Sequence, residues 1–420
     1  MKKKFLVGSG ALALLLVVAM LFAACEGPQG PRGHRGDQGE QGVGGPQGPS
    51  GPPGLPGLPG GPGVPAIPNV YFTSDISAEG LLALFLHALD GRDISAYNVA
   101  INIHGGEVGA DPVLQRSFSL EPDLIRDMVE YVIAAADDAS LVETNVSYGG
   151  ARTTTAGHLA TMAAFGYDEW PIVILDEVGV LEIPVRVGRR LSVNMVGDRL
   201  GDFDFYINLS HFSGHGQAGF GAALKNMSLG LASGPVAGVT GHGKQLIHSG
   251  GRDRTALMFL PHPTAMFHEA IAEASLSVLD YLGGPQYMLH ITVLNNLSID
   301  CDCMAAFFPV GLPTPDINDI GIVASWDPVA VDQAAVDLIW RKNGTHLRAN
   351  LVIPDDPRWE AAPPAAPTAG NALARGARAE GQGIALLDRI EAMNSQWKLA
   401  WGQAIGLGSM VYTLVDIDSP

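Results

Sequence analysis

The chain has 420 residues, of which 47% are hydrophobic and 16% are charged. Its formal net charge is −18, and the part that follows the three N-terminal lysines carries −21. So acidic a chain is not expected to bind nucleic acid or to dock on anionic lipid through charge. Three cysteines are too few for a disulfide framework, so a large hydrophobic core must hold the fold together.

The N-terminus has the pattern of a bacterial export signal. Three lysines precede an apolar run from Phe5 to Ala24, and Cys25 follows small residues. This order is typical of a secretory signal, and the cysteine resembles the lipidated first residue of a mature lipoprotein. We therefore predict a lipoprotein-type signal peptide over residues 1–25 and a chain anchored by lipid to the cell membrane, facing the extracytoplasmic side. The alternative is an uncleaved signal-anchor, because an apolar run of this length can span a bilayer.

Residues 26–66 carry glycine at every third position. The period holds from Gly27 to Gly63, over 13 triplets, and proline fills many of the intervening positions. Only glycine fits the axis of three wound polyproline-II chains, so the period predicts a collagen-like stalk. A triple helix would make the protein a homotrimer. The alternative is a monomeric, stiff spacer of polyproline-II character.

Residues 67–420 are predicted to form a globular α/β domain. Helical and β-branched apolar segments alternate along it, which favours a mainly parallel sheet flanked by helices, in one body or in two lobes. Helices are expected at residues 76–91, 121–138, 153–166, 267–282, 327–343 and 383–406. Strands are expected at 97–106, 139–146, 170–177, 202–212, 287–294, 319–325 and 410–417, with a hairpin over 181–196 and an irregular loop over 354–383.

Polar residues follow several of these strands, where ligands gather in parallel sheets. The densest group comes after 202–212 and holds His211, His215, Lys225 and Asn226 among many glycines. Histidines four apart would share one face of a helix, as in metal sites, but the serine and glycines between them favour a loop. Taken singly, each histidine is more simply interpreted as structural. Taken as a group, these residues make a stronger case for a functional site.

Three further polar groups follow the same logic. In each, the simpler alternative is a solvated turn or a surface loop, although lysine and histidine beside glycine can also bind an anion. The groups are His104 and Glu107; Asn145, Tyr148, Arg152 and His158; and His242, Lys244 and His248.

Cys301 and Cys303 lie two residues apart, after the strand expected at 287–294. Such a pair can hold a soft metal ion, close a strained disulfide, or be two core thiols. Two cysteines cannot complete a four-coordinate site, so histidine or carboxylate would have to join them. The candidates are His211, His215, Asp300 and Asp302. Asp327, which precedes a proline, is expected to cap the helix over 327–343.

Taken together, these segments resemble a known family. The stretches INIHGGEVG, ETNVSYGGARTTTAGHL, SHFSGHGQAGFGAALKN, IDCDC, DIGIVASWDPVAVDQAAVDLI and AIGLGSMVYTL are similar to the domain of unknown function 362 family. Its members are often described as iron–sulfur centre proteins, and it has no settled reaction. The resemblance runs in order from Tyr71 to Ile417. It implies a set of recurring polar positions, namely His104, Glu107, Asn145, His158, His211, His215, Lys225, Asn226, Lys244, His248, Cys301, Cys303, Asp327 and Asp332.

The chain departs from this resemblance in one respect. Many relatives carry a ferredoxin-like insert with repeated cysteines, whereas this chain has none. No twin-arginine pair precedes the apolar run, so we expect export of an unfolded chain, which disfavours a preassembled cluster. An iron–sulfur cluster is therefore less expected here than a single zinc or iron ion.

From the sequence we expect a membrane-tethered, extracytoplasmic, metal-binding protein that acts on a small anionic substrate, as a redox enzyme or a hydrolase. The alternative is a non-catalytic binding or adhesion module displayed on a trimeric stalk. Cys301, Cys303, His211 and His215 would hold the metal. Lys225, Lys244, His248, Glu107 and His104 would be catalytic, and Asn145, His158, Asn226 and Asp327 would bind the small-molecule ligand.

Overall fold

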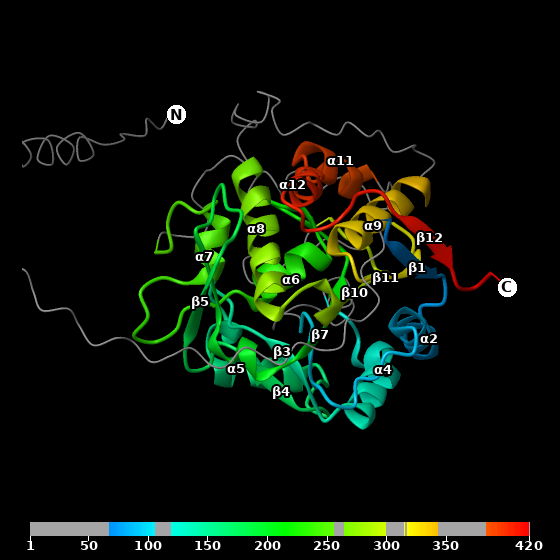
Figure 1. Cartoon of the computed structure of the whole chain (residues 1–420), viewed down its shortest axis with the longest axis horizontal. Coiled ribbons are helices and arrows are strands. Elements are labelled where there is room, and N and C mark those ends of the chain that lie inside the picture. Colours follow the sequence, from blue (N-terminus) through cyan, green and yellow to red (C-terminus); the bar gives the residue numbers. More distant parts are fainter. Residues whose placement is uncertain are drawn as a thin grey trace, which may run out of the picture. The chain divides into compact units, whose positions relative to one another are not determined.

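The computed structural model describes residues 67–105, 119–255, 264–299, 315, 317–342 and 384–419 (Figure 1). These residues all belong to one compact unit, Pro59–Pro420. The expected signal peptide with Cys25, the collagen-like stalk, Glu107, Cys301, Cys303 and the loop over 354–383 lie outside the described residues. Within the described ranges, no helix is long and apolar enough to cross a membrane.

An eight-stranded sheet forms the centre of this unit, in the order β12-β1-β11-β10-β7-β2-β3-β4. Strand β11 runs antiparallel to both of its neighbours, and the other neighbouring pairs are parallel. The predicted mainly parallel α/β sheet is confirmed, although sequence analysis missed β1. The strands are β1 (Asn69–Thr73), β2 (Asn98–Asn102), β3 (Asp138–Glu143), β4 (Ile172–Ile174), β7 (Phe205–His211), β10 (Met288–Leu294), β11 (Gly321–Ser325) and β12 (Thr413–Asp416).

Helices cover both faces of the sheet (Figure 1). On one face lie α2 (Ala78–Leu89), α4 (Pro122–Ala135) and α5 (Thr155–Ala164). On the other lie α6 (Ala223–Leu231), α7 (Gly243–His248), α8 (Thr264–Leu282), α9 (Pro328–Lys342), α11 (Ile384–Ala392) and α12 (Trp397–Ala404). The result is a three-layer sandwich with a separate apolar core on each face of the sheet.

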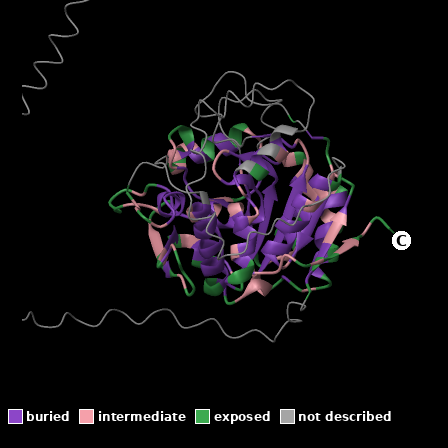
Figure 2. Ribbon diagram, turned by 90° about the horizontal axis from the view of Figure 1, so that it is seen from above, coloured by how far each residue is buried: buried purple, intermediate pink, exposed green. Residues whose placement is uncertain are grey.

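The strands are apolar on both faces because both faces are covered. In β2, Val99 and Ile101 pack into the core beneath α2, α4 and α5, whereas Ala100 packs into the opposite core. Buried strands of parallel sheets have this near-continuous apolar pattern. Figure 2 shows the same distribution, with buried residues filling the sheet and the helix sides that face it.

Local signals set the helix ends. Helix α2 begins at Ser77, whose hydroxyl accepts a hydrogen bond from the Gly80 N–H at 3.0 Å. Helix α9 begins after Asp327, whose Oδ1 accepts from the N–H groups of Val329 and Ala330, both at 2.9 Å. The predicted cap at Asp327 is therefore confirmed, and it satisfies backbone donors that have no partner within the helix.

Two local predictions were wrong. The last helix was expected to run unbroken over 383–406, but it is divided into α11 and α12, and Asn394 lies between them with φ of 52°. Asparagine tolerates this left-handed conformation better than most residues. The segment between His211 and His215 was expected to be a loop, but it belongs to a hairpin of β8 (Ser213–His215) and β9 (Gly219–Gly221).

The remaining elements are short. The hairpin predicted over 181–196 is confirmed as the antiparallel pair β5 (Val180–Pro184) and β6 (Val193–Gly197). Three 3-10 turns complete the described elements, namely η1 (Ala151–Thr153), η2 (Asp198–Asp202) and η3 (Pro285–Tyr287).

Candidate functional site

The strand order creates a switch point between β2 and β7. From β2 the sheet continues through β3 to β4 on one side, while β7 and then β10 lie on the other side. Segments that leave the carboxyl ends of β2 and β7 therefore diverge, and open α/β sheets bind ligands in the crevice formed at such a point.

A cavity of about 130 Å³ opens at this place. Its described lining comes from the carboxyl ends of β2 and β3, from the β8–β9 hairpin and from α6 and α7. The walls are partly apolar, and the polar lining side chains include His104, Glu143, Thr144, Arg152, His215, Lys225, Asn226, Lys244 and His248. The structure thus brings eight of the polar residues singled out in the sequence together, from segments up to 144 residues apart in the chain.

Lys244 is a buried cation in this cavity. Its Nζ donates hydrogen bonds to the Ala232 carbonyl oxygen, at 2.7 Å, and to the Thr144 hydroxyl. No carboxylate of the described residues lies within ion-pair distance of Nζ. Burial lowers the pKa of Lys244 to about 8, against the charges of Asp176 and Glu143, which raise it. The amine is therefore mainly protonated at pH 7. Its hydrogen-bond partners among the described residues are uncharged.

Helix α7 holds Lys244 in place through a close approach of backbones. A Cβ on Gly243 would lie 1.9 Å from the Met195 carbonyl oxygen of β6, so only glycine fits there. The His242 ring caps α7, because its Nδ1 accepts from the Gln245 N–H at 3.1 Å. Of the two alternatives for this segment, the surface loop is wrong, because residues 243–248 form a buried helix.

Helix α6 carries Lys225 and Asn226 into the cavity lining. The Asn226 amide donates to Asn208 Oδ1 at 2.9 Å and to the Asn102 carbonyl oxygen at 3.2 Å. One side chain therefore fastens the helix to both strands that border the switch point, β2 and β7.

Beneath α6, three strands share one row of buried polar side chains. Asn102, Asn208 and His290 are paired in register across β2, β7 and β10. The Asn102 amide donates to Asn208 Oδ1 at 3.0 Å, and the Asn208 amide lies 3.1 Å from His290 Nδ1. Burial lowers the pKa of His290 to about 3, so the ring is neutral and its Nδ1 accepts. These three residues were not predicted from the sequence as site candidates, although each interrupts an apolar strand.

Glu143, at the end of β3, organises the other side of the cavity. It forms a buried ion pair with Arg152 and accepts a hydrogen bond from the Gly105 N–H. Its Oε1 lies 3.9 Å from His104 Nδ1, and its Oε2 lies 3.2 Å from His158 Nε2. Burial alone would raise the pKa of Glu143, but the charge of Arg152 keeps it well below its usual value. Glu143 was not among the residues predicted from the sequence. The only feature that could have indicated it is that an acidic residue ends an apolar strand.

His158 supports this network from behind. It is fully buried on α5, and its Nε2 accepts a hydrogen bond from Arg152 Nε at 3.0 Å. Burial lowers the pKa of His158 to about 4, so the ring is neutral. His158 does not belong to the described lining of the cavity, and its place is to hold Arg152 against Glu143.

Two more sequence candidates lie away from the cavity lining. Asp327 caps α9, and its Oδ2 accepts from the Ser409 N–H at 2.8 Å, so it ties that helix to the C-terminal segment. The Asn145 N–H donates to Asp176 Oδ1 at 2.8 Å. Asp327 thus has a clear structural role, whereas this contact of Asn145 is made by its backbone, and its buried side-chain Oδ1 has no hydrogen-bond partner among the described residues.

His211 and His215 differ in their suitability as metal ligands. A ligating histidine normally donates its second ring N–H to an acceptor. His211 fits this pattern, since Nε2 lies 2.7 Å from the Asn295 carbonyl oxygen and the buried Nδ1 has no hydrogen-bond partner among the described residues. At His215, Nδ1 already accepts from the N–H groups of Gln217 and Ala218, so Nε2 carries the proton. The described residues contain no group of three potential ligands.

The chain leading to the cysteines runs beside the β8–β9 hairpin. The Gly214 N–H donates to the Ser298 carbonyl oxygen at 2.7 Å. A Cβ on Gly214 would lie 1.8 Å from the Ile299 carbonyl oxygen, so the two backbones are in direct contact. Ile299 precedes Cys301 by two residues, which places the start of the cysteine segment next to the histidine-bearing hairpin.

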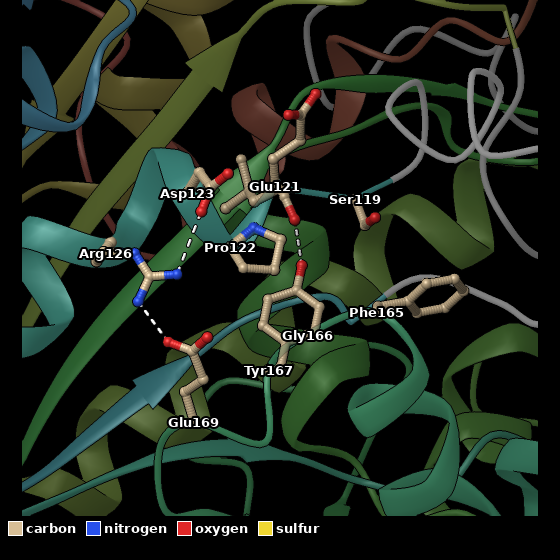
Figure 3. Close-up of a pocket in the computed structure, with 10 residues that line it drawn as sticks. Ser119, Glu121, Pro122, Asp123, Arg126, Phe165, Gly166, Tyr167 and Glu169 are labelled. Atoms are coloured by element: carbon tan, nitrogen blue, oxygen red, sulfur yellow. Dashed lines mark hydrogen bonds and ion pairs between the residues drawn. The ribbon is translucent and has the colours of Figure 1, made fainter.

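A second pocket, of about 290 Å³, lies at the N-terminus of α4 (Figure 3). Arg126 is the single cation of its described lining, and it pairs with Asp123 at 3.2 Å and with Glu169. The Tyr167 hydroxyl donates to the Leu120 carbonyl oxygen. Because that cation is already paired with acidic neighbours at the surface, this pocket offers less to a charged ligand than the cavity at the switch point.

Comparison with known proteins bears on the same region. Residues 99–337 match the family described as Domain of unknown function (DUF362), a span from β2 to α9 that includes all of the described cavity lining. No curated protein matches the chain, and no solved structure matches it. Since the match covers more than half of its residues, the chain belongs to the DUF362 family.

Proposed function

We propose that this protein binds a small anionic ligand in the cavity at the switch point. The observation that carries the proposal is Lys244, a buried ammonium that faces a cavity and has no carboxylate within ion-pair distance among the described residues. Burying a charge without a counter-charge is costly, so such groups are normally paired. An anion in the cavity would provide the missing partner.

The other lining groups support the same ligand class. Lys225 is a second lysine of the lining, and Arg152 forms an ion pair with Glu143. Ile103, Val146 and Leu229 give the cavity an apolar wall. A cavity of about 150 Å³ accommodates a benzene-sized molecule, so the ligand that suits this one is a compact carboxylate or phosphate.

Binding of simple anions to the full-length protein tests this proposal. Orthophosphate, acetate and pyruvate should each be assayed by calorimetry and by thermal unfolding. At least one should bind, and Lys244→Met and Lys225→Gln should weaken that binding by tenfold or more. Arg126→Gln, at the second pocket, is the matched control and should bind as the wild type does. Equal binding by all variants would refute the proposal.

A metal ion near the cysteine segment is a second proposal, supported by the contact between Gly214 and Ser298. Cys301, Cys303 and His211 would hold zinc or iron, because thiolates and imidazole suit both metals. His215 was expected as a fourth ligand, but its accepting Nδ1 leaves it better suited to donate a hydrogen bond from Nε2. When bound, the ion would supply a Lewis acid or a redox centre beside the anion cavity.

Elemental analysis of the purified full-length protein tests the metal. We expect about one zinc or iron per chain in the wild type, and none when Cys301→Ser and Cys303→Ser are combined. His211→Gln should lose most of the metal, whereas His215→Gln should keep it. A wild-type protein without stoichiometric metal under reducing conditions would eliminate this proposal.

The cellular setting is proposed from the sequence pattern. Cys25 after an apolar run supports a lipid anchor on the extracytoplasmic side, and the Gly-X-Y period supports a homotrimeric stalk. Light scattering on detergent-solubilised protein should give three chains, and Cys25→Ser should abolish labelling by a fatty acid. A bound anion that is never converted would favour the alternative of a non-catalytic binding module on that stalk.

A further inference from the structure

The amine of Lys244 is placed for covalent chemistry as well as for charge. We infer that Lys244 forms an imine with a small 2-oxo acid in the cavity at the switch point. This inference rests on the proposed anion binding and adds two things to it, namely the substrate class and the reactive atom.

The amine of Lys244 lies in an environment that is unusual for a lysine. Lysines in proteins are almost never fully buried unless they are paired, yet Lys244 Nζ donates its hydrogen bonds within the described residues to the uncharged oxygens of Thr144 and Ala232. The two nearest acidic groups are engaged elsewhere. Asp176 accepts from the N–H groups of Asn145 and Gly234, and Glu143 pairs with Arg152. Neither carboxylate therefore forms an ion pair with the amine, although the charges of both raise its pKa.

Burial also makes the amine of Lys244 more reactive. Reactive lysines are activated by desolvation and by a second cationic group nearby. Burial is the main cause that lowers the pKa of Lys244 to about 8. The charges of Asp176 and Glu143 raise this pKa, and the smaller effects of Arg152 and Lys225 lower it. With that pKa about one tenth of the amine is unprotonated at pH 7, far more than for an exposed lysine.

The cavity lining also indicates a class of substrate. Lys225 lines the same cavity and can hold a carboxylate, while the apolar wall suits the carbon chain. A molecule that carries a carboxylate next to a ketone would use both lysines at once. Pyruvate, with about six non-hydrogen atoms, matches a cavity slightly smaller than a benzene-sized one.

The step balances without an external reagent. The unprotonated amine attacks the ketone carbon, and an N–H proton moves to the carbonyl oxygen to give a carbinolamine. That oxygen then leaves as water while the C=N bond forms. Overall, the ammonium and the ketone give a protonated imine and one water, so no oxidant or reductant is needed. His104 and His248 also line the cavity, and imidazole groups can move protons in such steps.

A purely structural role for Lys244 is the competing explanation. Ala232 is the C-cap residue of α6, and lysine at a helix C-terminus stabilises the free carbonyl groups. That role requires only a positive charge, which arginine also supplies. Lys244→Arg therefore separates the two explanations, since arginine can cap the helix and bind an anion but cannot form the imine.

Reductive trapping tests the inference. Full-length protein is incubated with pyruvate and sodium borohydride, and the adduct is located by intact mass and peptide mapping. We expect one adduct per chain, at Lys244, and none in Lys244→Arg or Lys244→Met. Lys225→Gln should require at least tenfold more pyruvate for half-maximal trapping, and Arg126→Gln should behave as the wild type. Acetone, which lacks the carboxylate, should give much less adduct than pyruvate.

The outcomes distinguish this inference from the binding proposal. Anion binding that depends on Lys244, without an adduct at that residue, would overturn imine formation and leave the binding proposal standing. Absence of both binding and adduct would overturn both. An adduct spread over surface lysines, or one that persists in Lys244→Arg, would also overturn the inference. If Lys244→Arg unfolds, protection of wild-type Lys244 from trapping by excess orthophosphate decides whether the adduct forms in the cavity.

Discussion

Asp332 Oδ1 accepts a hydrogen bond from the Ala223 N–H at 2.8 Å, so a carboxylate of α9 caps the first turn of α6. Its Oδ2 also accepts from the Leu224 N–H, at 3.2 Å. Because α6 carries Lys225, this buried contact between two distant helices orients part of the cavity lining. Asp332 is one of the positions implied by the family resemblance, and its role in the structure is to position the helix.

Loss of this cap should therefore weaken the fold. Asp332→Asn keeps the shape of the side chain but turns a donor toward one of the two N–H groups. A buried donor left without an acceptor costs about 1–3 kcal/mol, and we expect a decrease of that size in the free energy of unfolding. Urea denaturation followed by circular dichroism measures it. A denaturation midpoint equal to that of the wild type would show that the cap is dispensable.

The ion pair of Glu143 and Arg152 should be strongly coupled. Glu143→Gln leaves a buried guanidinium without its counter-charge, and such changes cost about 3–5 kcal/mol. Adding Arg152→Met to that variant should recover much of the loss, because it removes the unpaired charge. Arg126→Gln breaks only an exposed pair, so its effect should stay below about 1 kcal/mol. Additive losses at 143 and 152 would contradict the coupling.

Stability should decrease on mild acidification. Burial lowers the pKa of His158 to about 4 and that of His290 to about 3, both below the usual value near 6.5. The unfolded chain therefore takes up more protons than the folded one as the pH falls from about 6.5 to 4, so the free energy of unfolding decreases over that range. His290→Gln removes one such group and should show a smaller decrease. Urea unfolding at pH 7, 5.5 and 4.5 measures the slope.

Binding of an inorganic anion should depend on pH in the alkaline range. Lys244, with a pKa lowered to about 8 by burial, is charged below that value and loses its proton above it. Affinity for sulfate, whose own charge is constant over this range, should therefore be level from pH 6 to 7 and decrease above pH 8. Calorimetric titration in matched ionic strength measures this. An affinity that stays constant to pH 9.5 would mean that another cation holds the anion.

The contact between the hairpin and the cysteine segment can be tested with two glycines. A Cβ on Gly214 would meet the Ile299 carbonyl oxygen at 1.8 Å, whereas the nearest neighbour of a Cβ on Gly216 lies at 3.7 Å. Gly214→Ala should separate the two backbones, lower the melting temperature by several degrees and reduce the metal content. Gly216→Ala should leave both quantities unchanged. Equal behaviour of the two variants would argue against a metal site that depends on this contact.

The site itself could be predicted only in part. Lys244, Lys225 and His104 stood out because they follow strands or lie among glycines, and they do line one cavity. Glu143 was missed because it ends an apolar strand and has no motif around it. His158 and Asp327 were expected to bind a ligand, but in the structure they support Arg152 and cap α9. Pattern alone does not distinguish a polar side chain that faces a cavity from one that satisfies the backbone.

The sequence by itself determined the class of fold, most of the helices and strands, and the collagen-like period, because these depend on spacing along the chain. A 3.6-residue period, a run of β-branched residues and a glycine at every third position are local patterns. The order of the strands, the row of Asn102, Asn208 and His290, and the lack of an ion-pair partner for Lys244 among the described carboxylates were decided by the tertiary structure. These features depend on which distant segments become neighbours, and that follows from packing both faces of one sheet rather than from any local pattern.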